Sequence, residues 1–433
     1  MNVKIVSVII LMCGYAFSQD SILTLSKAIK YSVSQNTSTQ LSINQIDQKD
    51  IALKSEQYGR LPDASASLSS SMSGRIDNEA KWSSSTDGSL GASYTYTPST
   101  GATIKSLKAQ SDASRYSYKQ TVNDITASVV SAYIKAAYAQ KAIAIVKNNL
   151  DYQKAKLTQI EEFKNAGKKS IADVLQQQTA VAESEASLLT AEQTYGKAML
   201  SLYNIAGIDI HSTMSIDTNE IEFLQSRFSQ LNNSNANEFL IDSIPQIQSQ
   251  QKSVLSSQFR IKSARLAYIP SIKGSASTGI SYGGLLGEDH DVSDPTGRLS
   301  LSLSYPLFDQ YKRKLNVSRE KLSLQSAQLQ LTELERKVEL QYEQYNYDLQ
   351  FAQKQLTVAQ TRLTAAKQSL DAINERYDAG ASTLVEVAMV NTSYLGAVNS
   401  QLSAESSLLS AYVNLLQVRG DAASFFNSQT GTR

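Results

Sequence analysis

Cysteine, histidine and proline are scarce in this sequence, and their scarcity excludes several kinds of chemistry. The 433 residues include one cysteine, two histidines and six prolines. The cysteine, Cys13, lies in an apolar N-terminal run, so we expect a mature chain without disulfides or thiol chemistry. His211 and His290 stand in separate polar segments with no metal-ligand spacing around them, which argues against a zinc site or a catalytic triad. We therefore expect no enzyme, no cofactor and no metal.

The chain also lacks an excess of charge of either sign and long apolar runs. Lys and Arg number 41 against 40 Asp and Glu, which gives no reason to expect a nucleic-acid partner. No glycine-rich run ends in Gly-Lys-Ser or Gly-Lys-Thr, so no nucleotide-binding loop is predicted. Beyond residue 18 we expect no apolar run of the about 20 residues that a membrane-spanning helix needs. A mature chain that enters a membrane is then expected to do so through β-strands.

The first residues have the pattern of a secretory signal. Lys4 supplies a positive start, residues 5–17 are apolar, and Ala16-Phe17-Ser18 is a small-x-small cleavage site. This predicts a signal peptide over residues 1–18 and a mature chain that begins at Gln19. A lipid on Cys13 is the alternative, but the bulky residues just before it do not fit a lipobox.

Proline and glycine positions reveal a repeat that spans the mature chain. Two prolines recur 208 residues later and two glycines recur 213 residues later: Pro62 as Pro270, Pro98 as Pro306, Gly167 as Gly380 and Gly207 as Gly420. An insertion of about five residues in the second half reconciles the two spacings. We divide residues 19–433 into repeat one (about 19–207), a linker (about 208–236), repeat two (about 237–420) and a C-terminal tail (421–433).

Apolar residues recur at alternating steps of three and four in both halves, which is the heptad pattern of a coiled coil. In the second half the seam consists of Leu356, Ala359, Leu363, Ala366, Leu370, Ile373 and Tyr377. The matching seam of the first half is Ile143, Val146, Leu150, Gln153, Leu157, Ile160 and Lys164. Further seams follow Gly167 and Gly380, which we expect to be the turns of two helical hairpins. Helical pattern is unbroken over 103–163 and 314–377, and about 60 residues make a rod on the order of 90 Å.

Between the paired prolines the apolar period changes to two, which predicts strands. The predicted strands are Ala64–Gly74, Gly88–Thr97, Ser271–Tyr282 and Arg298–Tyr305, joined by polar loops over 75–87 and 283–297. The candidates for lipid-facing or interface positions are Tyr94, Tyr96, Tyr282, Leu299, Leu301, Leu303 and Tyr305. Apolar residues that alternate with Ser, Thr and Gly suit a membrane barrel, and the alternative is an ordinary soluble sheet. Four strands cannot close a barrel, so a barrel requires several copies of the chain.

The order of these features resembles the outer-membrane efflux protein family, the TolC-like channels, over essentially the whole mature chain. Four segments carry the resemblance. They are Leu23–Asn36 as the opening helix, Tyr268-Ile269-Pro270 before a strand, Tyr305-Pro306-Leu307-Phe308 after a strand, and Arg376–Gly380 with Thr383–Val387 at a hairpin tip.

The resemblance implies a mainly α fold with a membrane β-barrel. Long coiled-coil hairpins in two tandem repeats would each contribute two strands to a twelve-stranded barrel formed by a homotrimer in outer-membrane lipid. It also implies a periplasmic adaptor at the hairpin tips and an inner-membrane pump of the RND or ABC type. The implied function is the passive exit duct of a tripartite efflux or type I secretion system, which carries small molecules or polypeptides. The duct is expected in the bacterial outer membrane and extends into the periplasm. An adhesive coiled-coil surface protein would explain the heptads but not the four strands.

Acidic residues after the tip turns are a further implication of the resemblance. Members of the family often line the narrow periplasmic entrance with acids three residues apart, which makes Glu386, and Asp173 in the first repeat, candidate pore acids. Met389 stands where the second acid is expected, and Ser382 replaces a basic residue that helps to latch some members. Ser170-x-x-Asp173 and Thr383-x-x-Glu386 are also capping boxes, so the alternative is that both acids only cap helices.

Overall fold

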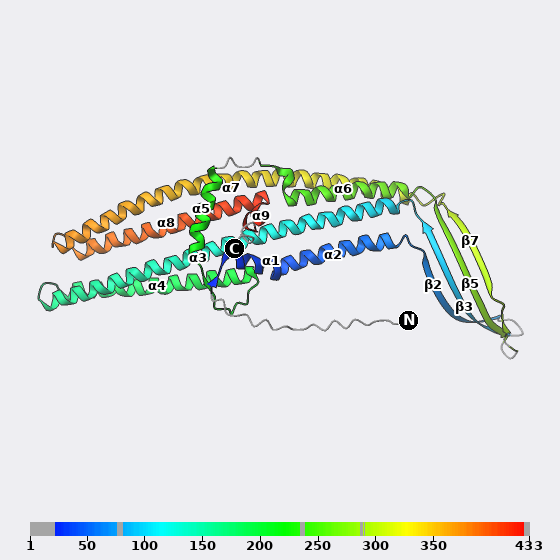
Figure 1. Ribbon diagram of the computed structural model, residues 1–433, viewed down its shortest axis with the longest axis horizontal. Helices are drawn as coiled ribbons and strands as arrows, with labels where there is room; N and C mark the ends of the chain where they lie inside the picture. The colour runs from blue at the N-terminus through cyan, green and yellow to red at the C-terminus, as the bar shows by residue number, and fades with distance from the viewer. Residues whose placement is uncertain (1–21, 76–80, 234–238, 286–288, 290, 428–433) are drawn as a thin grey trace.

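The computed structural model describes residues 22–75, 81–233, 239–285, 289 and 291–427. The predicted signal peptide lies outside these residues. The molecule is elongated, with two helical hairpins at one end and a sheet at the other (Figure 1). One hairpin consists of α3 (Thr100–Asn165) and α4 (Ile171–Ala206), and the other of α7 (Lys312–Asp378) and α8 (Leu384–Arg419). The two long helices contain 66 and 67 residues, about 100 Å at 1.5 Å per residue. The predicted rods are confirmed.

The predicted seams form the contacts within and between the hairpins. Leu150 and Ile160 of α3 and Ala359, Ile373 and Tyr377 of α7 are buried. Nearer the sheet, α2 (Thr37–Tyr58) and α6 (Pro245–Leu266) lie beside α3 and α7 (Figure 1). The helical part of the described chain is therefore built from helix pairs and contains no separate globular domain.

The main core surrounds the middle of α3. Val129, Val130, Tyr133 and Ile134 are fully buried there, against α1 (Leu25–Gln35), α5 (Asn219–Asn233), α9 (Ala422–Asn427) and the neighbouring helices. The predicted linker thus includes α5 and β4 (Ser215–Ile216), which pairs in parallel with β1 (Ile22–Leu23). Inside repeat two, the short 3-10 helix η1 (Ile241–Ser243) precedes α6.

The same segment corrects one expectation. By length and hydropathy, α3 contains a window that could cross a membrane, with a mean hydropathy of 1.2 and 44% of the window buried inside the chain. The expectation of no such run after residue 18 was therefore wrong. The physical reason is that this part of α3 is a core helix, whose alanines and branched apolar residues pack against helices on several sides.

The sheet is antiparallel along its main strands: β2 (Asp63–Arg75), β3 (Lys81–Tyr96), β5 (Ser271–Leu285) and β7 (Thr296–Ser304), in that order, with the short β6 (Asp291–Val292) also on β5. Two predicted loops were drawn too long. Residues 81–87 belong to β3, and residues 283–285, 291–292 and 296–297 also lie in strands. Serine, aspartate and glycine usually indicate loops, but here serine forms most of one face of the sheet, and the glycines lie on both faces.

Candidate functional site

The sheet divides its residues into two chemically different faces. Directly opposed residues of an antiparallel pair share a face, and the register places Ala92, Ala276 and Leu299 in one row and Tyr94, Gly274 and Leu301 in the next. The large members of this face are Leu68, Met72, Trp82, Leu90, Tyr94, Tyr96, Ile272, Ile280, Tyr282, Leu299, Leu301 and Leu303. All of them are exposed, Leu299 to 86% and Leu301 to 81%. A continuous apolar face of this size indicates contact with lipid or protein.

The opposite face of the sheet consists mostly of serine. Serine hydroxyls are hydrogen-bonded across neighbouring strands: Ser67 with Ser89 (2.8 Å), Ser71 with Ser85 (3.0 Å), Ser73 with Ser83 (3.1 Å) and Ser275 with Ser300 (2.6 Å). Asp63, Asp87, Lys273 and Arg298 stand at register positions of the same face. Apolar-out and polar-in alternation is the pattern of a membrane barrel with a water-filled interior.

Aromatic residues bound the apolar face at two levels. Tyr94 and Tyr96 lie near the helical end of β3, whereas Trp82 and Tyr282 lie toward the other end of the sheet. The twelve residue-to-residue steps from Trp82 to Tyr94 span about 40 Å along a strand, or about 30 Å of membrane at a tilt of about 40°. This matches the hydrocarbon thickness of a bilayer, about 30 Å. Trp82 was not among the sequence candidates because it lay in a predicted loop.

Trp82 also packs closely on its cross-strand partner. Gly74 lies directly opposite Trp82, and a Cβ atom at Gly74 would come within 2.5 Å of the indole ring. The glycine thus makes room for the chain's only tryptophan. A large aromatic ring that covers a strand glycine is a known way to stabilise such a position.

The two Tyr-containing motifs meet at one arginine at the helical rim of the sheet. The Arg313 guanidinium lies 5.1 Å from the ring centre of Tyr268 and 5.4 Å from that of Tyr305. It donates a hydrogen bond to Asp309 Oδ2 at 2.7 Å and another to the carbonyl oxygen of Pro306. Asp309 holds the pKa of Arg313 above its usual value, and Arg313 holds the pKa of Asp309 below its usual value. We call these contacts the Arg313 clasp; they fix the path from β7 into α7.

The hairpin turns are built as predicted. Gly167 and Gly380 both have a φ of +73°, a left-handed conformation that costs a glycine little, and each follows its long helix. Both capping boxes are present. Ser170 N donates to Asp173 Oδ2 at 2.9 Å, and Thr383 N donates to Glu386 Oε2 at 2.8 Å.

The two acids differ in their surroundings. Asp173 is partly buried, and the hydrogen bonds from the Ser170 backbone and hydroxyl lower the pKa of its carboxyl. Glu386 is exposed, and it lies one helical turn before Met389, which is also exposed. The structure thus confirms the caps, and a role of these acids in a pore stays a prediction.

The hairpins contact each other near these tips. Tyr152 of α3 donates a hydrogen bond to Asn374 Oδ1 of α7 at 3.1 Å, and Lys156 Nζ lies 4.1 Å from the ring centre of Tyr377. Lys156 also forms an ion pair with Asp378 at 3.9 Å. Burial lowers the pKa of Lys156, an effect that Asp378 opposes. Below these polar contacts, an apolar cluster joins both hairpins: Ile160, Val174, Ile373, Tyr377, Leu384 and Val387.

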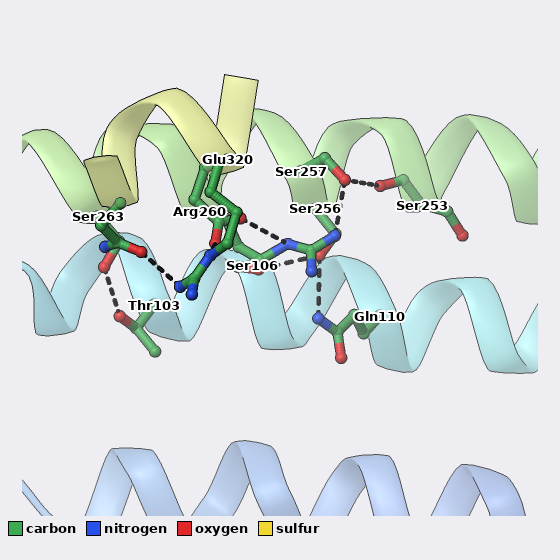
Figure 2. A network of polar contacts seen from close by, with 11 residues as sticks. Thr103, Ser106, Gln110, Ser253, Ser256, Ser257, Arg260, Ser263 and Glu320 are labelled. Atoms are coloured by element: carbon green, nitrogen blue, oxygen red, sulfur yellow. Dashed lines mark hydrogen bonds and ion pairs between the residues drawn. The ribbon is translucent and has the colours of Figure 1, made fainter. Parts of the chain in front are cut away.

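Near the sheet the two repeats meet through small polar side chains instead. Thr103 and Ser106 of α3 share hydrogen bonds with Ser263 (2.8 Å) and Ser256 (2.9 Å) of α6, as Figure 2 shows. Arg260 donates to Ser257 at 2.7 Å and pairs with Glu320 of α7 at 3.9 Å. Small residues allow α3 and α6 to approach closely, so the helices adjoining the sheet form one connected wall.

A sheet with one lipid-compatible face, continued by helical hairpins of about 100 Å, defines a channel protomer of the outer-membrane type. Comparison with known proteins supports this class. The sequence profile of the outer membrane efflux protein family matches residues 45–208 and 240–421. The chain belongs to the outer membrane efflux protein family.

Known proteins are similar along most of the chain. Protein CyaE of Bordetella pertussis is 24% identical over 328 residues, which cover 74% of this chain and 67% of that protein. The CmeC outer membrane channel of Campylobacter jejuni superposes with a TM-score of 0.77 at 16% identity, covering 94% of this chain and 89% of CmeC. The MtrE outer membrane channel of Neisseria gonorrhoeae, solved in an open state, superposes with a TM-score of 0.73 at 17% identity. The superposition covers 92% of this chain and 89% of MtrE.

Membership of the family fixes the place and the kind of function. The chain is a passive exit duct of an efflux or secretion system in the outer membrane, and it extends into the periplasm. Members of the family are trimeric channels that interact with adaptor and inner-membrane pump proteins. These channels are not enzymes.

Proposed function

We propose that three copies of this chain form one continuous duct, with a twelve-stranded barrel in the membrane and a helical tunnel below it. The observation that carries this proposal is the sheet with two faces and two open edges. Among the described residues, β2 pairs only with β3, and β7 pairs only with β5. Unpaired edges in lipid cost several kcal/mol for each unsatisfied backbone group, so the edges of neighbouring copies must pair.

The orientation of each face follows from its chemistry. Leu299, Leu301 and Leu303 would contact the hydrocarbon of the outer-membrane lipid, and the serine face would line the interior. A wall of small neutral hydroxyls, with acidic and basic side chains among them, offers hydrogen bonds of either kind and charges of both signs. Such a wall suits cargo of varied chemistry, small molecules or polypeptides, and leaves selection of the cargo to the pump.

We propose further that the hairpin tips receive a periplasmic adaptor, and that an inner-membrane pump of the RND or ABC type supplies the energy. In support, the chain has no glycine-rich nucleotide-binding loop of its own. The exposed position of Glu386 beside the second turn supports a narrow, acid-lined entrance at this end. A role of Asp173 there is the equivalent proposal for the first repeat.

Two measurements test the duct. Native mass spectrometry in detergent should give a homotrimer, and a folded monomer extracted from the membrane fraction would contradict the barrel. The purified trimer should conduct ions across a planar bilayer. A trimer that inserts but does not conduct would favour a structural or adhesive coiled-coil protein instead.

A further inference from the structure

Two groups of exposed apolar residues stand at opposite edges of the sheet, both at its helical rim. After β7, Leu307 is 91% exposed, and Phe308 and Tyr311 are also exposed. Before β2, Tyr58 is 65% and Leu61 is 63% exposed. Neither group belongs to the apolar face that we assign to lipid, because both lie outside the strands. They need a different partner.

The strand edges indicate what that partner is. In the proposed trimer, β7 of one copy pairs with β2 of the next, and the two strands are antiparallel because β2 leads away from the helices and β7 leads back to them. Polar residues must lie opposite polar residues for the faces of the sheet to continue. Ser304 and Asp63 belong to the polar face, whereas Leu303 and Ala64 belong to the apolar face. At the helical end of the sheet, β7 ends at Ser304 and β2 begins at Asp63. If both of these strand ends are paired, Ser304 of one copy lies opposite Asp63 of the next.

This register determines what meets beyond the strands. Residues that follow Ser304 in one copy lie opposite residues that precede Asp63 in the next. This register brings Leu307 and Phe308 of one copy close to Leu61 of the next copy. Beyond this contact, α7 continues alongside α2 of the next copy. The exposed residues on these two helices also match in spacing. On α7 they are Leu315, Leu322 and Leu329, and on α2 they are Ile51 and Tyr58, in both cases seven residues apart.

We propose that residues Leu307–Tyr311, which we call the collar segment, cover Tyr58 and Leu61 of the next copy of this chain. Three such contacts would form an apolar ring at the rim where the barrel meets the helical tunnel. The proposal rests on the trimer of the proposed function, and it adds the particular surface through which neighbouring copies recognise each other.

The collar segment is held in one conformation before any partner arrives. Gln310 and Tyr311 have φ values of 57° and 62°, which non-glycine residues rarely adopt. The Arg313 clasp closes this turn, because Arg313, which follows it, is hydrogen-bonded to Asp309 and to the Pro306 carbonyl, which precede it. Phe308 packs edge-on against Tyr311, with ring centres 6.0 Å apart. A surface that is ordered in advance loses less entropy on binding, which favours a specific protein contact.

Cysteine crosslinking tests the collar contact directly, because the chain contains only Cys13. We would combine Leu61→Cys with Leu307→Cys, and Leu61→Cys with Phe308→Cys, and oxidise the membranes with copper phenanthroline. Within one copy the two positions flank opposite edges of the four main strands. These edges are about 14 Å apart at about 4.8 Å per strand, too far for a disulfide. Crosslinking should therefore give covalent dimers and trimers on a non-reducing gel.

Matched controls limit the interpretation. Each single cysteine variant should stay monomeric on the gel, which accounts for Cys13. Leu189 is 67% exposed but lies on α4, far from the sheet (Figure 1). Leu189→Cys combined with Phe308→Cys should therefore give no crosslink. As a second readout, Leu307→Asp combined with Phe308→Ser should lower the temperature at which the trimer dissociates, whereas replacement of an exposed polar residue of α4, Glu192→Ser, should leave it unchanged.

The outcomes separate the collar from the duct. A trimer by native mass spectrometry without a crosslink in either pair overturns the collar contact and leaves the proposed function intact. Absence of a trimer in the unaltered chain overturns the proposed function itself. A fluorophore on Leu307→Cys that is quenched by brominated lipid, together with no crosslink, would assign the segment to the membrane and also overturn the collar contact.

Discussion

Gln177 of α4 donates two hydrogen bonds to Gln153 of α3, one to the backbone carbonyl oxygen at 3.0 Å and one to the side-chain oxygen at 2.7 Å. Both residues are buried between the two helices of the first hairpin. The other predicted seam positions of α3 are apolar, except Lys164 next to the turn. A slide of the helices would leave two buried amides without partners. We infer that the pair fixes the register of the hairpin.

Replacement of one member of this pair should cost more than replacement of both. Gln177→Leu leaves the amide of Gln153 buried without its donor, and we expect a loss of about 1–3 kcal/mol in the free energy of unfolding. The double variant Gln153→Leu with Gln177→Leu removes both polar groups and should recover most of this loss. Thermal unfolding followed by circular dichroism measures the effect, with exposed Thr179→Leu as the control. Losses that simply add in the double variant would contradict the pairing.

An arginine on β7 should impair assembly on one face of the strand and be tolerated on the other. Leu301→Arg places a charge on the face that we assign to lipid, at a cost of about 2–4 kcal/mol near the midplane. Ser302→Arg places it on the polar face, where water can solvate it. We expect the folded trimer in outer-membrane fractions, seen as a heat-sensitive band on a gel, to decrease for the first variant only. Equal amounts of trimer in both variants would remove β7 from the lipid boundary.

The sequence predicted the long helices closely because their signal is strong and local. Heptad spacing over about 60 residues and glycine turns define each hairpin with little ambiguity. The four main strands and their faces were predicted, but each was drawn too short at its loop end. Thr97 and the candidate Tyr305 lie just outside β3 and β7, and the short strands β1, β4 and β6 were not predicted. Serine at most of the alternate positions of β2, and at about half of those of β3, has the composition of a loop, and only cross-strand pairing distinguishes these segments from one. Trp82 was therefore missed, although an isolated tryptophan between alternating residues was a usable signal.

Contacts between distant segments could not be predicted in the same way. The motifs around Tyr268 and Tyr305 were visible, but not that both rings would contact Arg313. Lys156 occupies a heptad position that is usually on the surface. It is buried only because the second hairpin packs on it, through Tyr377, which lies 221 residues further along the chain. Such contacts depend on how the two repeats pack, which no local pattern records.

Lys156 provides a test of how the hairpins are held together at the tips. Lys156→Ala removes the contact with the Tyr377 ring and the ion pair with Asp378, and a cation–π contact contributes about 0.5–2 kcal/mol. We expect the two tips to separate more often. Spin labels on Lys168→Cys and Ala381→Cys, one at each turn, would report this as a longer or broader distance distribution. Lys154, which pairs with Glu185 within one hairpin, is the control, and Lys154→Ala should leave the distribution unchanged.

Glu386 provides the last test, because its two proposed roles respond differently to loss of charge. As a cap, the carboxylate accepts a hydrogen bond from Thr383 N at 2.8 Å. Glu386→Gln retains an oxygen that can accept this bond, so the cap should persist with little change in thermal stability. As a pore acid, three copies would converge at a constriction, where charges of one sign concentrate counter-ions.

We therefore expect the Glu386→Gln trimer to lose part of its preference for cations. The measurement is the reversal potential of single channels in a salt gradient across a planar bilayer. Glu183→Gln removes another exposed carboxylate, which lies on α4, ten residues beyond Asp173 and away from the turn, and it should leave the reversal potential unchanged. A reversal potential for Glu386→Gln equal to that of the unaltered, well-folded trimer would reject the pore role. Glu386 would then be only a helix cap. The assignment of the chain as a channel would not change, because it depends on the sheet and on membership of the family.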